Sequence, residues 1–180
     1  MAKKLNAEEV KFYSHLGQLS TLFARLEYLI REITGLYIVR DSHHQMVYLS
    51  IIGKYSLEKN TALLKELTYI NSFGDKQKSL LKLIGEVNHI RNIRNLFIHG
   101  LWDDPFIENE EIVIICNDKS FSLKKKIKEQ EQLLHFRSNE AKKFSLGTIK
   151  KHIQQLEKIN TGLSAILNEI EDDPSEYFEL

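Results

Sequence analysis

A long apolar stripe near the start of the chain constrains the fold more than any other feature. Its residues recur at alternating steps of four and three, which places them on one face of an α-helix of about 3.6 residues per turn. They are Phe12, Leu16, Leu19, Phe23, Leu26, Ile30, Ile33 and Tyr37. The spacing predicts a helix over about residues 7–36, with the stripe in a bundle core or against a second copy of the chain.

The composition favours a mainly α fold. The 180 residues include only eight glycines and two prolines, whereas a β-sandwich or barrel needs turn-forming residues at frequent intervals. Apolar residues make up 42% of the chain, which is enough for one hydrophobic core without disulfides or metals as staples. We therefore expect a single domain over residues 1–172 and a disordered acidic tail over residues 173–180.

Apolar spacing and capping residues predict three further helices. The first spans about residues 48–70, and Gly53 is a point where it can bend or break. The second spans about residues 75–99, and Gly100 is expected to end it in the left-handed conformation. The third begins after Ser145, which is a favourable N-cap, and continues to about residue 170.

Between the last two of these helices the pattern becomes that of β-strands. Residues 111–116 form a β-branched run, residues 117–118 favour a turn, and residues 120–123 alternate polar with apolar. This predicts a small β-hairpin over about residues 110–124, inserted before the last helix of an up-and-down bundle. We interpret residues 124–143 as an irregular or short helical connection. Cys116, the single cysteine, is predicted to be a small buried hydrophobe.

Charge is balanced overall but uneven along the chain. The 25 Lys and Arg equal the 25 Asp and Glu in number, so bulk charge does not favour a protein that coats nucleic acid. Between residues 119 and 158, however, eleven Lys and Arg stand against four Glu, a region that either attracts phosphates or is a solvated surface. Without a secretory signal or an apolar run of membrane-spanning length, we expect a cytoplasmic protein that does not contact the membrane.

Polar residues also align along the helix predicted over residues 75–99. On an ideal helix they fall within a sector of about 60°, which either faces water or lines a polar site. They are Asn88, Asn92, Asn95 and His99. Arg91 lies at the edge of this stripe, but Arg94 is about 140° away from His99. A site that uses both therefore requires a bent helix end or two copies of the helix that meet about a twofold axis.

The run from Arg94 to His99 resembles the Arg-x(4 to 6)-His signature of HEPN ribonucleases, which are small helical RNA-cleaving domains. In that family the position after the arginine is commonly polar, and here it is Asn95. The Gly100-Leu101-Trp102 sequence that follows also resembles several HEPN branches. The resemblance is specific over residues 91–102 and extends as helical order over residues 16–170, which implies a HEPN-like bundle.

The resemblance implies metal-independent RNA cleavage, in which the ribose 2′-hydroxyl attacks the adjacent phosphate and leaves a 2′,3′-cyclic phosphate. His99 would transfer protons, since an imidazole titrates near neutral pH, and Arg94 would stabilise charge on the phosphate. Asn95 would orient the imidazole or the phosphate by hydrogen bonding. The other substrate-binding candidates are Arg91, Asn92 and Asn88. No cofactor or metal is expected.

The resemblance also suggests partners. A homodimer with a shared active site would supply one histidine as base and another as acid. Besides RNA, an antitoxin or a nucleotidyltransferase is a candidate partner, because HEPN domains of this size often act as bacterial toxins or antiphage effectors.

Each of these residues also has a purely structural explanation. Arg91 and Arg94 could pair with Glu86 or Asp103, and His99 could interact as a cation with the negative end of its helix. The second hypothesis is therefore a non-catalytic HEPN-type dimerisation or partner-binding module. The adjacent His43 and His44 do not indicate a metal site, since neighbouring side chains diverge.

Overall fold

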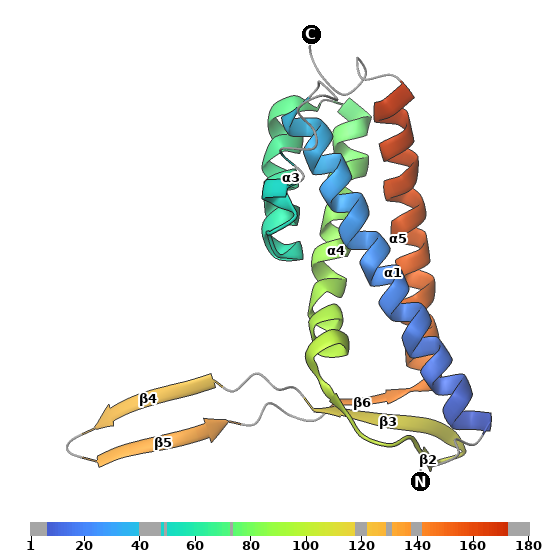
Figure 1. Cartoon of the computed structure of the whole chain (residues 1–180), viewed down its shortest axis with the longest axis vertical. Coiled ribbons are helices and arrows are strands. Elements are labelled where there is room, and N and C mark those ends of the chain that lie inside the picture. Colours follow the sequence, from blue (N-terminus) through green and yellow to red (C-terminus); the bar gives the residue numbers. More distant parts are fainter. Residues whose placement is uncertain are drawn as a thin grey trace.

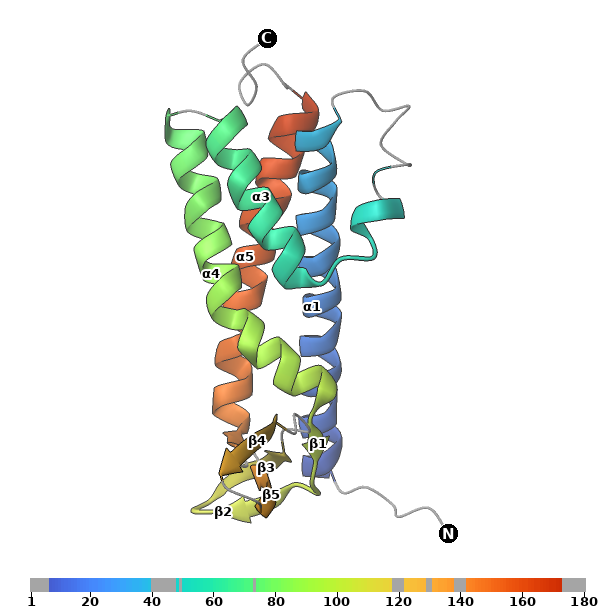
Figure 2. The ribbon, with the colours of Figure 1, turned by 90° about the vertical axis from the view of Figure 1, so that its left-hand side faces the viewer.

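Helices α1, α3, α4 and α5 lie side by side and form most of the molecule (Figures 1 and 2). The computed structural model describes residues 7–39, 48, 50–72, 74–117, 122–128, 131–137 and 142–172. Within these residues the helices are α1 (Ala7–Ile38), α3 (Leu57–Asn71), α4 (Gly74–His99) and α5 (Leu146–Asp172). In Figure 2, α4 runs in the opposite direction to the other three. The predicted mainly α bundle is confirmed, whereas the expected tail over residues 173–180 lies outside the described residues.

The apolar stripe of α1 forms the centre of the core. Phe12, Leu19, Phe23, Leu26, Ile30, Ile33 and Tyr37 are all buried, and Leu16 is partly buried against them. Burying each large apolar side chain stabilises the fold by roughly 1.5–3 kcal/mol relative to leaving it exposed. The stripe therefore packs within a single chain, against α3, α4 and α5, and the helix extends two residues further than predicted.

The helix predicted over residues 48–70 breaks at the expected glycine. Residues 53–55 form a turn and a bend between helical residues 50–52 and α3. Ser56 then caps α3, with its Oγ accepting a hydrogen bond from the Lys59 backbone N–H at 3.3 Å. The buried Asn60 donates from Nδ2 to the Ile52 carbonyl at 3.1 Å, which ties the two sides of the break together.

The strands stand before α5, as predicted, but the predicted hairpin partner is wrong. They are β1 (Leu101–Trp102), β2 (Phe106–Glu108), β3 (Glu111–Asn117), β4 (Ser122–Lys128), β5 (Glu131–Arg137) and β6 (Lys142–Ser145). The central strand β3 pairs antiparallel with β1, β2 and β6, whereas β4 pairs with β5 in a two-stranded sheet separate from the other described strands. In Figure 1 this second sheet extends to one side of the bundle.

The true hairpin joins β3 to the residues before it. Asn109 and Glu110 have φ values of 50° and 64°, the left-handed pair that a two-residue turn between twisted strands requires. Asn109 tolerates this conformation, and beside the turn Glu108 pairs with Glu111 and Ile107 with Ile112 across the ladder. The prediction of a turn at residues 117–118 missed this signal. The predicted irregular connection over 124–143 is also wrong, because it contains most of β4, all of β5 and the start of β6.

Helix α5 closes the core and begins as predicted. Ser145 caps it, accepting a hydrogen bond at Oγ from the Thr148 backbone N–H at 3.2 Å. The apolar face of α5 is buried along its whole length, from Ile149 to Ile170. This face packs most extensively against α1, so the first and last helices form the longest seam in the bundle.

Candidate active site

The candidate site lies where α4 ends and the first strand begins. The Gly100 backbone N–H donates to the Leu96 carbonyl at 2.8 Å, which continues the helical pattern for one residue. The prediction that Gly100 adopts the left-handed conformation is wrong. Among the described residues, the glycine with a positive φ is Gly74, at 64°. A Cβ at position 100 would instead lie 2.2 Å from Cys116 Sγ and 2.5 Å from the Leu96 carbonyl oxygen. Glycine is required there because strand β3 packs directly on the helix end.

Three aromatic rings fix the helix end to the sheet. The centroid of Phe97 lies 4.7 Å from that of Trp102 and 5.1 Å from that of Phe144. Trp102 also donates from Nε1 to the Phe97 carbonyl at 3.2 Å. Cys116 is fully buried beside them, as predicted. The Gly100-Leu101-Trp102 sequence that resembles HEPN proteins therefore has a packing role here at Gly100 and Trp102.

Arg94 is oriented by an acidic residue of α1. Its Nε donates to Glu27 Oε1 at 2.7 Å, and the same carboxylate oxygen lies 2.5 Å from Arg94 NH2. The two side chains are 19% and 28% exposed, so this ion pair is screened less than one on an open surface. On its other side, Arg94 NH1 donates to Asn95 Oδ1 at 3.2 Å. The guanidinium plane is thus held from two directions.

The sequence analysis did not identify Glu27 as part of the site. Glu27 is 67 positions from Arg94 and lies directly after a buried residue of the α1 stripe, Leu26. A charged residue at the margin of an apolar stripe is a weak signal that it has a partner, but no sequence pattern could name that partner.

Arg91 ties α4 to α3. Its NH1 lies 3.3 Å from Glu58 Oε1, and Glu58 stands in the first turn of α3. The alternative partners considered from the sequence were Glu86 and Asp103. Instead, both arginines pair with acidic residues of neighbouring helices, so each pair links α4 to another helix of the bundle.

The asparagines of the polar stripe face solvent. Asn88, Asn92 and Asn95 are all exposed in the single chain. The backbone of His99 ends α4, but its imidazole lies outside the described part of the structure, as do His43 and His44. The structure thus places Arg94, Asn95 and an exposed amide row on the last turns of α4.

Among the described residues, no three His, Cys, Asp or Glu side chains are placed to hold a metal ion. The described helices also include none that is both long and apolar enough to cross a membrane. What remains is an oriented arginine beside exposed amides, an arrangement that can bind an anion such as a phosphate.

Comparison with known proteins adds no relative. No family model, curated protein or solved structure matches the chain.

Proposed function

We propose that the chain is a metal-independent endoribonuclease of HEPN type, with its active site at the end of α4. The observation that carries this proposal is the guanidinium of Arg94, held by Glu27 and Asn95 on the helix that ends at His99. An arginine fixed before substrate arrives loses little side-chain freedom on binding a phosphate, and its planar fork matches two phosphate oxygens. Glu27 is then a positioning residue for Arg94.

In this proposal His99 moves the protons. It takes the proton of the ribose 2′-hydroxyl or donates one to the leaving 5′-oxygen, while Arg94 stabilises the charge that develops on the phosphate. The 2′-oxygen bonds to phosphorus as the bond to the 5′-oxygen breaks, which leaves a 2′,3′-cyclic phosphate and a 5′-hydroxyl. The reaction needs no metal or cofactor.

The exposed amides supply the substrate surface. Asn92 and Asn88 lie one and two turns before Asn95 on the exposed stripe of α4, where RNA or a second copy of the chain can reach them. A homodimer would bring a second His99 to the site, so that one imidazole serves as base and the other as acid. Such an enzyme would act on RNA in the cytoplasm as a toxin or an antiphage effector, held in check by an antitoxin or a nucleotidyltransferase.

A non-catalytic role as a dimerising or partner-binding module is the second candidate. It is favoured by the ion pairs themselves, since Glu27 and Glu58 give Arg94 and Arg91 a structural purpose without any substrate. The packing role of Gly100 and Trp102 points the same way.

Cleavage of single-stranded RNA by the purified full chain in EDTA separates the two candidates. We expect Arg94→Ala and His99→Ala each to lower the cleavage rate by roughly 10²–10³-fold, the usual effect of removing a charge-stabilising group or a general acid or base. The matched control is His89→Ala, which removes an exposed histidine from the same helix and should leave the rate unchanged. The new 3′ ends should carry cyclic phosphate.

Two results would overturn the ribonuclease. Cleavage that survives both substitutions belongs to another site or to a contaminating nuclease. A wild-type chain that sediments as a stable dimer but cuts no RNA supports the non-catalytic module instead.

A further inference from the structure

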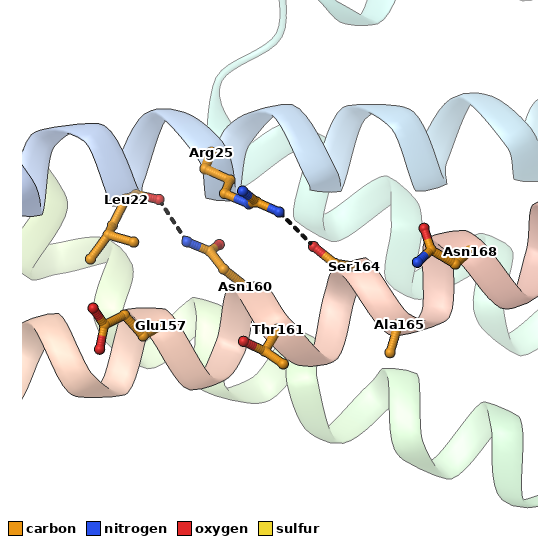
Figure 3. Close-up of a pocket in the computed structure, with 8 residues that line it drawn as sticks. All are labelled: Leu22, Arg25, Glu157, Asn160, Thr161, Ser164, Ala165 and Asn168. Carbon is orange, nitrogen blue, oxygen red and sulfur yellow. Dashed lines mark hydrogen bonds between the residues drawn. The ribbon is translucent and has the colours of Figure 1, made fainter.

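A groove lined mainly by residues with polar side chains follows the seam between α1 and α5, and the role inferred for it goes beyond the proposed function. The groove is open to solvent and has a volume of about 490 Å³, within the range of small-ligand sites. Leu22 and Arg25 line it from α1 (Figure 3). From α5 the polar lining includes Glu157, Asn160, Ser164 and Asn168. Figure 3 shows the last three of these side chains on the side of α5 that faces α1.

Two opposite charges at the groove have only neutral partners. Arg25 NH2 donates to Ser164 Oγ at 3.3 Å, and Glu157 Oε1 accepts from Gln18 Nε2 at 3.2 Å. In the described part of the chain neither charge forms an ion pair, although both line the same groove. A ligand with one positive and one negative group would complement both, whereas a doubly negative nucleotide would place its excess charge beside Glu157.

Between the two charges lies a buried amide with an unused acceptor. Asn160 is 3% exposed, and its Nδ2 donates to the Leu22 carbonyl at 3.0 Å. Its Oδ1 is buried and accepts no hydrogen bond from any described residue. A buried acceptor without a donor is unfavourable, and a small rotation of the side chain would present this oxygen to an N–H group in the groove.

The spacing of these groups indicates the length of the ligand. Glu157 and Ser164 are seven positions apart on α5, which is about 10 Å along the helix axis. An extended peptide advances roughly 3.3 Å per residue, so three residues cover the same distance. Such a peptide would place its backbone N–H groups near Asn160, midway between the two charges.

We propose that the α1–α5 groove binds a short peptide of about three residues with free termini. The ammonium group binds at Glu157, the carboxylate binds at Arg25 and Ser164, and a backbone N–H donates to Asn160 Oδ1. The groove recognises the termini and the backbone, so the side chains of the peptide contribute less.

Titration of the isotope-labelled full chain with trialanine, followed by NMR, tests the proposal. We expect saturable chemical-shift changes at residues 157–168. Arg25→Gln and Glu157→Gln should each weaken trialanine binding by about tenfold or more, since each removes one charge-assisted contact. Lys11→Gln and Lys158→Gln are matched controls, because these exposed lysines stand on the same two helices outside the groove lining. Both controls should bind as the wild type does.

Capped peptides provide the second arm, which needs no variant to fold. Trialanine with an acetylated N-terminus and trialanine with an amidated C-terminus should each bind about tenfold more weakly than the free peptide. A fully extended ω-amino acid of equal length tests Asn160, because it keeps both charges but lacks the amides. Absence of saturable shifts at millimolar trialanine would overturn the proposal, as would binding that is indifferent to capping.

Discussion

Two neighbouring residues of α1 serve two different polar regions. Arg25 and Glu27 are two positions apart, so they point about 160° away from each other around the helix. Glu27 faces α4 and forms an ion pair with Arg94, whereas Arg25 faces α5 and donates a hydrogen bond to the neutral Ser164. In the first region two opposite charges pair within the chain. In the second, Arg25 and Glu157 have neutral hydrogen-bond partners, which leaves both charges for the proposed ligand. Arg94 depends on its planar fork, which contacts Glu27 through two nitrogens, whereas Arg25 depends mainly on its charge.

The largest expected difference between the two arginines is in RNA cleavage. Arg94→Lys keeps the charge but loses the fork that bonds Glu27 through both Nε and NH2, so we expect the cleavage rate to fall roughly 10²-fold. Arg25→Lys should leave the rate within about twofold, since Arg25 contacts α5 rather than α4. Single-turnover cleavage measures both. Equal losses would show that the two sides of α1 are not independent.

A smaller difference is expected in stability. Glu27→Gln removes one member of the partly buried pair and should lower the free energy of unfolding by about 1–2 kcal/mol, between the values for exposed and buried pairs. Arg25→Gln removes a single hydrogen bond at an exposed site and should cost less than about 0.5 kcal/mol. Urea denaturation at neutral pH resolves the two. If Arg25→Gln proved the more costly, the groove would be a structural seam of the fold.

The smallest expected effect concerns His152 of α5, whose protonated form is disfavoured by burial and by the nearby His89 of α4. Burial lowers the pKa of His152, and the positive charge of His89 lowers it further. The folded protein therefore binds this proton less readily than the unfolded chain, whose histidine has a pKa of 6.5. Stability should decline as the pH falls below 6.5. The melting temperature of His152→Gln should fall less between pH 7.5 and pH 5.5 than that of the wild type, and an unchanged slope would contradict this.

The helices could be predicted because their signals are local. The stripe from Phe12 to Tyr37 repeats along one helix face, and Ser145 caps the helix that follows it directly. The strands were harder, since their partners depend on which segments meet in space. Strand β3 is buried at Val113, Ile114 and Cys116, so it takes the centre of a sheet, whereas the lysine-rich β4 pairs outside that sheet.

The candidate site was only partly visible in the sequence, for the same physical reason. Arg94 and Asn95 are adjacent, and the structure joins them by a hydrogen bond. The ion pair with Glu27 is a tertiary contact that no periodicity encodes. Gly100 was recognised as necessary, but its reason is the space taken by Cys116 and not a left-handed backbone.

Because Cys116 packs closely against Gly100, the reactivity of this single thiol reports on the contact between β3 and the end of α4. Cys116 is fully buried, and its Sγ lies 3.5 Å from the Leu96 carbonyl oxygen. Labelling must wait until the sheet parts from the end of α4. The rate at which a maleimide dye labels Cys116 therefore measures how often β3 separates from the end of α4, the helix that carries Arg94.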